Sequence, residues 1–482
     1  MKTMIRMNRC AAIIILIILC TNYNGYTQQN ADTVLSLKQC VDIAIANNIQ
    51  VKQTELQMQT DYLTLKQARD NRLPELSANA NHGINQGRSI DPFTNSYINQ
   101  NVGYGNYSLS AGLNLFNGGL IKNSITQNRF GFEASRMDLQ QEKEDVTINI
   151  ILAYLQILNN EDLLQQSTNQ FALTQKQVER LEVLNKEGSI IPAQLYELKG
   201  QLANDELAII NNQNSLDGAT LALCQLMNIP YKKIRVEKIS SEENVKLPES
   251  DPALIYSSAL AQFPSVKAAA LRRQSGEAAI KVAKGEFYPL IGVGGGLNTN
   301  YSSAASNDIF INTVQEPSGD YVDFGGTKIP VITTRPNFNS QKIKYSDQFR
   351  NNYSTSVNLF IRIPLLNYNQ AKNRVALAKA QYKNAEFLEQ TAGTQLSQNI
   401  EQANFNMTAA YKKYSVLQKQ VSDFEEAFKI AEVRFNAGAS NQVEYLIAKN
   451  NVDNSKINLI IARYDYILRT KILDYYQGRL VL

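Results

Sequence analysis

The sequence predicts a membrane protein of the α+β class, in which long antiparallel coiled-coil helices are combined with four transmembrane β-strands per chain. Three observations predict it: hydrophobic residues recur every seven positions over long stretches, shorter stretches alternate with a period of two, and the whole pattern occurs twice in the 482 residues. Each half of the chain therefore contains the same series of elements.

The first residues have the pattern of a secretory signal peptide. Basic residues precede an apolar run at 11–19, and a polar stretch follows it. The run is too short for a membrane-spanning helix, which needs about 20 apolar residues. We expect residues 1–27 to be the signal, with cleavage between Cys20 and Gln28. Lipidation of Cys20 is disfavoured because Leu19 is bulky where a small residue is preferred.

Composition excludes several classes of function. Removal of the signal takes away three basic residues and no acid, so the formal charge falls from +4 to +1 and leaves no basic footprint for nucleic acid. Beyond the signal only Cys40, Cys224 and the single histidine His82 remain, with no CxxC, so a metal site or a Cys–His nucleophile has almost nothing to be built from. We expect no cofactor and no enzyme activity. A Cys40–Cys224 disulfide is allowed outside the cytoplasm, but the sequence does not decide it.

The duplication is clearest around two glycines. "LNKEGSIIPAQLYELK", which contains Gly188, lies 250 positions before "RFNAGASNQVEYLIAK", which contains Gly438. Near the start of each half the offset is about 215, so an insertion falls at 299–352, a stretch rich in Asn, Ser, Gly and Pro. We expect a long exposed loop there. The mature chain divides into a first structural repeat, 28–240, and a second, 241–482, each with a helix, two strands and a helical hairpin.

A seven-residue hydrophobic period predicts the long helices. It runs through Ile150, Ile157, Leu164, Phe171 and Val178 in the first half and Ile400, Met407, Tyr414, Val421, Phe428 and Phe435 in the second. After each polar turn it resumes, at Leu195, Leu202, Ile209, Leu216 and Leu223 and at Tyr445, Val452, Leu459, Tyr466 and Leu473. Spacing of this kind indicates α-helices packed as a coiled coil. An ordinary coiled-coil scaffold would show the same period.

Just before each long helix the period is two. Residues 107–115 and 353–363 alternate apolar with small or polar side chains, and weaker partners at 76–84 and 290–297 each follow a proline. Segments of about 10 residues with aromatic residues toward their ends are typical of transmembrane β-strands. A soluble two-sided sheet would alternate similarly. The signal peptide, together with the lack of any other anchor, favours the membrane.

Strand number and helix length predict an assembly. Four strands cannot close a barrel in lipid, so chains must pool them, and three chains would give a 12-stranded barrel wide enough for a pore. The helix expected at 120–186 would be about 100 Å long, and its return at 192–228 covers about half of that length. A further helix at 252–285 supplies the remaining length. In the same way, the helices expected at 443–476 and 37–73 together match the length of the long helix of the second half. We therefore expect a hollow helical cylinder below a β-barrel, with both polar turns at its far end.

These features together resemble the TolC-type outer-membrane efflux family, over essentially the whole mature chain. The resemblance is carried by the duplicated plan, by the strand ends "LFNGG" and "LLNYN", and above all by "RFNAGASNQVEYLIAK", which is similar to the family's Arg-aromatic-x-x-Gly turn beginning here at Arg434. It implies a homotrimeric channel-tunnel in the outer membrane of a Gram-negative bacterium, with a large periplasmic helical portion.

The resemblance also implies roles for residues at the turns. The surface that contacts a periplasmic adaptor would contain Asn185, Gly188, Ser189, Gly438, Ala439 and Ser440. The entrance gate would contain Gln194, Glu197 and Glu444, where the family often has Asp six residues after the glycine. In a trimer, three copies of Glu444 around a narrow aperture would attract cations. The alternative for Glu444 is a solvated carboxylate on a helix surface.

The expected function is a passive outer-membrane conduit for the export of small molecules. Its partners would be a periplasmic adaptor and an inner-membrane pump of the RND, ABC or MFS type. The alternative is the outer-membrane outlet of a type I protein secretion system, which no feature of the sequence separates from the first reading. A periplasmic coiled-coil scaffold without a pore is a third alternative from a different class.

Overall fold

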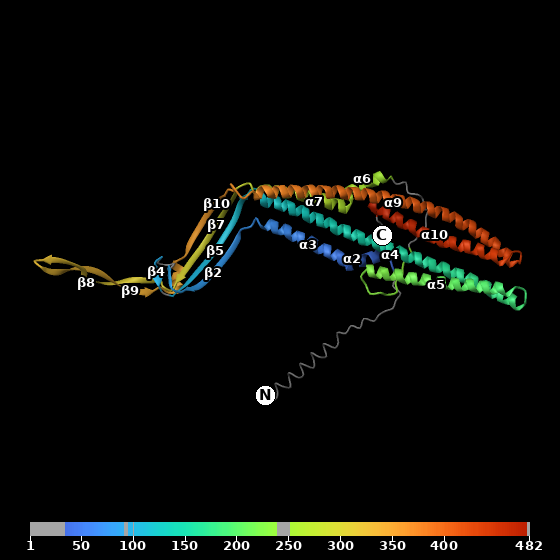
Figure 1. The fold of residues 1–482 in the computed structure, drawn as a ribbon, viewed down its shortest axis with the longest axis horizontal. Coiled ribbons are helices and arrows are strands. Elements are labelled where there is room, and N and C mark those ends of the chain that lie inside the picture. The colour runs from blue at the N-terminus through green and yellow to red at the C-terminus, as the bar shows by residue number, and fades with distance from the viewer. Residues whose placement is uncertain (1–33, 91–94, 100, 239–250, 480–482) are drawn as a thin grey trace, which may run out of the picture. The chain divides into compact units, whose positions relative to one another are not determined.

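The computed structural model describes residues 34–90, 95–99, 101–238 and 251–479. The expected signal peptide, with Cys20, lies outside the described residues. The described residues divide into two compact units, which we call the helical unit (34–50, 143–238, 251–255 and 400–479) and the sheet unit (51–90, 95–99, 101–142 and 256–399). Figure 1 shows the elements in chain order from blue to red.

Four strands form one antiparallel sheet in the sheet unit. They are β2 (Glu75–Asn85), β5 (Val102–Asn117), β7 (Leu290–Ser302) and β10 (Ser354–Arg362), in the order β10-β7-β5-β2. Each repeat supplies two neighbouring strands, and β5 and β7 join the two repeats, for example where Leu109 lies opposite Leu297. All four predicted strands are therefore confirmed, and β2 and β10 form the two edges of the sheet.

The glycines of "GVGGG" lie within β7, where one of them makes room for an aromatic ring. A Cβ atom at Gly292 would collide with the ring of Phe360 on the neighbouring strand β10. A side chain at Gly294 would press on the amide of Asn358 on the same strand. The glycines thus allow β10 side chains to lie across β7.

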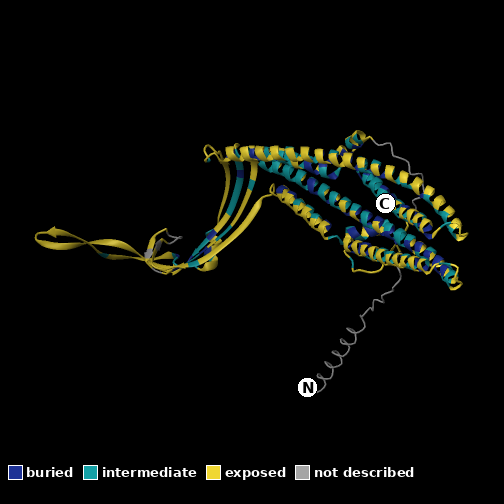
Figure 2. Cartoon of the chain, turned by 45° about the vertical axis from the view of Figure 1, so that its right-hand side comes forward, coloured by how far each residue is buried: buried dark blue, intermediate teal, exposed yellow. Residues whose placement is uncertain are grey.

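Residues 299–352 are not the loop that their composition predicted, and this expectation is wrong. Residues 299–302 are the end of β7, and the rest form a hairpin of β8 (Ser306–Phe324) and β9 (Thr327–Lys342), followed by the short helix α8 (Tyr345–Asn351). Phe324 and Thr327 flank a two-residue turn whose glycines, Gly325 and Gly326, both have positive φ, as tight hairpin turns require. The prolines of β8 and β9 argue against strands in the sequence, but proline is tolerated in edge strands, and both strands of a two-stranded hairpin are edges. Figure 2 shows both strands exposed along nearly their whole length.

The first repeat has a much smaller hairpin at the corresponding place. It consists of β3 (Arg88–Ile90) and β4 (Tyr97–Asn99), between β2 and β5. The two repeats therefore share one plan and differ mainly in the length of this hairpin.

The long helices of the two repeats have equal lengths. Helices α4 (Leu120–Lys186) and α9 (Gln370–Asn436) each have 67 residues, and their return helices α5 (Pro192–Leu226) and α10 (Gln442–Tyr476) each have 35. Among the described residues, no helix combines the length and apolar character needed to cross a membrane. The predicted heptads are confirmed where residues such as Ile150, Ile157, Ile400 and Met407 are completely buried.

The shorter helices are broken at corresponding positions of the two repeats. Helices α2 (Leu37–Asn47) and α3 (Ile49–Asp70) are separated at Asn48, and α6 (Pro252–Gln262) and α7 (Pro264–Gly285) are separated at Phe263. Asn48 and Phe263 lie 215 positions apart and both have extended backbone. Pro264 explains the second break, because a proline disfavours helical backbone at the residue before it and suits the first position of a new helix.

A small parallel pair of strands, β1 (Val34–Leu35) and β6 (Arg235–Val236), completes the helical unit. The hydroxyl of Tyr154, on α4, lies 2.7 Å from the carbonyl oxygen of Glu237 and 3.2 Å from that of Leu35. Cys40 and Cys224 are both buried and both are free thiols.

Candidate functional site at the hairpin turns

The two turns between the long helices have the same backbone geometry. Gly188 and Gly438 have φ angles of 70° and 72°. The amide of Ser189 donates to the carbonyl of Leu184 at 2.9 Å, and that of Ala439 donates to the carbonyl of Arg434 at 2.8 Å. These bonds end the helices in the Schellman pattern. A Cβ at either glycine would meet nothing within 4 Å, so the glycine is needed for its left-handed backbone and not for space.

The return helices begin differently after the two turns. Helix α5 begins with Pro192, which lacks the backbone N–H that would otherwise be unpaired there. Helix α10 is capped by Asn441, whose side-chain oxygen accepts a hydrogen bond from the amide of Glu444 at 2.9 Å. The carboxylate of Glu444 therefore lies in the first turn of α10, where the helix dipole favours negative charge.

Glu444 has a cationic neighbour within its own turn. The guanidinium of Arg434 lies 4.0 Å from its carboxylate, and both side chains are more than half exposed. An exposed pair of this kind contributes little to stability. It does place two predicted residues side by side, and the positive charge partly offsets the field of the carboxylate.

Polar contacts tie the two hairpins together close to the turns. The buried Gln442 donates its side-chain amide to the carbonyl of Gln194 at 2.9 Å. Arg180, on α4, donates to the carbonyl of Asn436, the last residue of α9, at 2.7 Å. The hairpins of the first and second repeats are therefore joined by hydrogen bonds close to their turns.

An apolar cluster lies beneath the turns. Its buried members, all from the first hairpin, are Val178, Leu181, Leu195 and Leu198. Phe435 and Leu446 of the second hairpin pack against it. Tyr445 is completely buried, with its ring centroid 4.8 Å from that of Phe435 and 5.7 Å from that of Phe428.

A groove lies between α5 and α10. It has a volume of about 550 Å³ and is lined by Glu197, Gly200, Gln201, Asn204, Val443, Leu446, Ile447 and Asn450. Glu197 is exposed and lies in this groove, apart from the Arg434–Glu444 pair. The three predicted gate residues thus occupy three different settings, and their common role as a gate stays a prediction.

The residues predicted to contact an adaptor lie at the turns. Gly188, Ser189, Gly438 and Ala439 are exposed, whereas Asn185 and Ser440 are partly buried. The hydroxyl oxygen of Ser440 is buried and has no hydrogen-bond partner among the described residues. No set of three or more His, Cys, Asp or Glu side chains in the described part of the chain could hold a metal ion.

Charged residues inside the helical unit were missed by the sequence analysis. Lys449 is completely buried on α10, and Asp205 is buried on α5. The sequence does contain a sign of this burial. Lys449 lies four residues after Tyr445 and three before Val452, which is the spacing of the buried face of a helix, and Asp205 lies seven residues after the buried Leu198. A charge at such a position indicates a partner on a facing helix.

A comparison with known families decides the identity. More than half of the chain, residues 40–228 and 325–474, matches the model of the family described as outer membrane efflux protein. The chain belongs to the outer membrane efflux protein family. Members of this family are transport channels of the outer membrane, so the predicted family, fold class and efflux function are confirmed.

Individual relatives of this efflux protein are distant. It is 29% identical over 109 residues to the toxin and drug export protein A of Aggregatibacter actinomycetemcomitans, a match that covers 23% of this chain and 24% of that protein. A Haemophilus influenzae protein is 20% identical over 399 residues, which cover 79% of this chain and 73% of that protein.

Solved structures share the fold. VceC from Vibrio cholerae matches with a TM-score of 0.71 at 15% identity, over 92% of this chain and 96% of that chain. The Campylobacter jejuni outer-membrane channel CmeC matches with a TM-score of 0.72 at 15% identity, over 92% and 86%. CusC matches with a TM-score of 0.70 at 16% identity, over 94% and 95%.

Proposed function

We propose that this efflux protein is a homotrimeric channel-tunnel in the outer membrane of a Gram-negative bacterium, and that it exports small molecules. The observation that carries the proposal is the open sheet. A signal peptide at 1–27 would direct the chain out of the cytoplasm, and the membrane-facing part would be the four-stranded sheet.

The two edges of the sheet are suited to join copies head to tail. Each neighbouring pair in the order β10-β7-β5-β2 is antiparallel, so β2 and β10 also run in opposite directions. Strand β2 of one copy can therefore add to β10 of the next as a further antiparallel pair. An unpaired edge cannot face lipid, because its backbone groups would have no hydrogen-bond partners.

One side of the edge strand β10 is apolar and exposed. Val357, Leu359 and Ile361 alternate along it and are exposed by 84%, 66% and 59%. Their neighbours along the strand point to the other side of the sheet. In a barrel of 12 strands, this apolar side would face lipid and the other would face the channel. Two copies would give eight strands, a barrel filled by its own side chains, so three copies fit a conduit.

The partners would be a periplasmic adaptor and an inner-membrane pump. The exposed turn residues Gly188, Ser189, Gly438 and Ala439 offer backbone groups and small side chains to an adaptor. The groove between α5 and α10 adds an apolar wall and a carboxylate, Glu197, next to them. The pump would be of the RND, ABC or MFS type, and it would supply the energy and most of the choice of cargo.

An outlet for protein secretion is the second candidate function. It is favoured by one observation, the relative described as a toxin and drug export protein, whose name covers both kinds of cargo. Both functions need the same trimer and the same pore. Export assays with a small dye and with a secreted protein, each in cells that lack other outlets, would separate them.

The pore is tested with a pair of neighbouring substitutions on β10. The purified full chain should run as a trimer in native mass spectrometry and give discrete conductance steps in a planar bilayer. Val357→Lys places a charge on the side that would face lipid, which costs about 2–4 kcal/mol at mid-membrane depth, so insertion and conductance should be lost. Asn358→Lys places the same charge on the channel side, so the trimer should persist with a shift toward anions. A monomer without conductance, or equal effects of the two lysines, would refute the proposal.

A further inference from the structure

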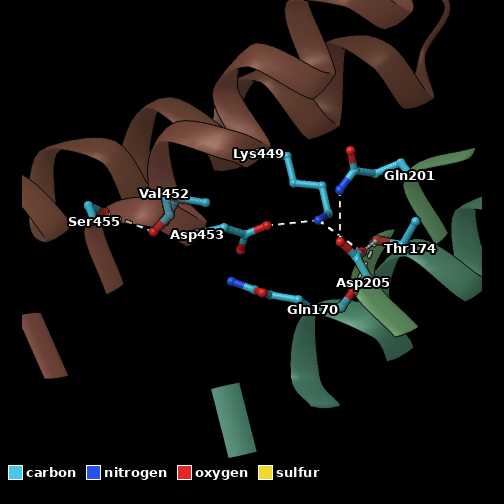
Figure 3. A network of polar contacts seen from close by, with 8 residues as sticks. All are labelled: Gln170, Thr174, Gln201, Asp205, Lys449, Val452, Asp453 and Ser455. Atoms are coloured by element: carbon cyan, nitrogen blue, oxygen red, sulfur yellow. Dashed lines mark hydrogen bonds and ion pairs between the residues drawn. The ribbon is translucent and has the colours of Figure 1, made fainter. Parts of the chain in front are cut away.

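One lysine and two aspartates form a buried cluster between helices α5 and α10 (Figure 3). The ammonium of Lys449 lies 2.7 Å from the carboxylate of Asp453 and 3.3 Å from that of Asp205. The side chains of Lys449, Asp205 and Asp453 are exposed by only 1%, 8% and 15%. All three belong to the helical unit, and they connect the hairpin of one repeat to that of the other.

The two carboxylates are not equally provided with donors. Asp205 accepts hydrogen bonds from the hydroxyl of Thr174 and from the amide of Gln201, in addition to the contact with Lys449. Asp453 accepts from Lys449 and faces the amide of Gln170 on α4. Asp205 thus has more donors around its carboxylate than Asp453 has, which leaves Asp453 the better placed of the two to take a proton.

The burial of Lys449 is not a by-product of the repeat. The lysine at the corresponding position of the first hairpin, 250 residues earlier, is Lys199. Its ammonium lies 2.7 Å from the carboxylate of Glu182, and both of these side chains are 42% exposed. The same residue type therefore points outward in one repeat and into the interface in the other.

The surroundings of the cluster are neutral or acidic. Helix α4 contributes the neutral Gln170 and Thr174, α5 contributes Asp205, and α10 contributes Tyr445 besides Lys449 and Asp453. Burial raises the pKa of the Tyr445 hydroxyl, and the carboxylate of Glu432, on α9, raises it further. One ammonium faces two carboxylates, so the fully ionised cluster carries an uncompensated buried negative charge, which is costly. A proton on Asp453 removes that charge.

We propose that Asp205, Lys449 and Asp453 form a proton-sensitive clasp, which holds α10 against α5 more firmly in mildly acidic than in neutral or alkaline solution. The clasp acts on the pairing of the two hairpins just behind their turns. It is independent of the cargo and of the membrane part of the molecule.

The direction of the effect follows from the protonation of Asp453. Burial raises the pKa of Asp453, an effect that the neighbouring Lys449 opposes and Asp205 reinforces. When the helices separate and water reaches this carboxyl group, its pKa returns toward the ordinary value. The packed state therefore binds the proton more tightly than the separated state. The stabilisation is fully present below the ordinary pKa and is lost as the pH rises through the raised pKa.

Hydrogen exchange of the full-length protein in detergent tests the clasp. The measured quantity is the protection factor of the α10 segment 442–456, with each rate corrected for the intrinsic pH dependence of exchange. Between pH 5 and pH 8 we expect protection in the wild type to fall, because the packed state loses the stabilisation that comes from the more tightly bound proton on Asp453. Asp453→Asn resembles the protonated acid, so its protection should stay high and flat with pH.

Three further variants, two single and one double, complete the test. Glu425→Gln removes an exposed ion pair between α9 and α10, in which the ammonium of Lys456 lies 2.7 Å from the carboxylate of Glu425. This variant should leave the pH dependence unchanged. Lys449→Met should steepen the loss of protection at high pH, and adding Asp205→Asn should restore much of it. A flat profile in the wild type, or the wild-type slope in Asp453→Asn, would overturn the proposal. Neither result depends on whether the protein forms a pore.

Discussion

Replacing Gly188 by alanine should loosen the first turn and leave the second unaffected. Gly188 has a φ of 70°, and a Cβ there would meet nothing within 4 Å, so the cost is backbone strain alone. A left-handed conformation costs an L-residue about 1–2 kcal/mol. That free energy raises the population of the locally opened turn about five- to thirtyfold. Gly438→Ala should have the same effect at the second turn, where φ is 72°.

Limited trypsin digestion measures this opening. When opening and closing are fast relative to cleavage, the rate follows the population of the open form. The reporters are Lys186, close to Gly188, and Arg434, close to Gly438, because trypsin cleaves after both residue types. Each alanine variant should accelerate cleavage at its own turn only.

The matched control is a glycine without positive φ. Gly218 lies within α5, and a Cβ there also meets nothing within 4 Å. Gly218→Ala should stabilise the helix by about 0.5–1 kcal/mol, because alanine loses less backbone entropy than glycine in a helix. Cleavage at the turns should then be unchanged or slower. The reasoning fails if Gly188→Ala leaves cleavage after Lys186 unchanged, or if Gly218→Ala accelerates it as much.

Three further predictions concern other residues of the helical unit. Tyr154→Phe removes the hydroxyl next to the carbonyl of Glu237, so the urea midpoint should fall by the equivalent of about 1–3 kcal/mol; an unchanged midpoint would show that water replaces the bond. Glu444→Gln should reduce the cation preference of single-channel currents if this carboxylate lines the entrance, and unchanged selectivity would remove it from the gate. Burial, with a smaller contribution from Cys224, raises the pKa of the Cys40 thiol to about 11. Alkylation of Cys40 by iodoacetamide should therefore be very slow in the folded protein at pH 8 and rapid in urea. Rapid labelling without urea would contradict the buried site.

Local periodicity determined much of the fold. The seven-residue period located both return helices to within a few residues, since a helix surface repeats on that spacing wherever it is packed. In the two long helices it located the later part only, because Ile150 and Ile400 each lie 30 residues after the first residue of their helix. The glycines at 188 and 438 ended the long helices, because an L-residue with a side chain is strained in the backbone that the turn needs. Strand alternation likewise located the four strands of the sheet.

The hairpin at 306–342 and the burial of Lys449 depend on tertiary contacts and cannot be predicted from periodicity. Residues 306–342 contain turn formers and prolines, and only cross-strand pairing shows that they form a hairpin. Lys199 and Lys449 occupy the same place in the two repeats, yet one is exposed and the other is buried. Lys449 is the buried one because the facing hairpin places Asp205 next to it. A charge can enter a helix interface only when a residue distant in sequence pairs with it, and that pairing is a property of the packed helices.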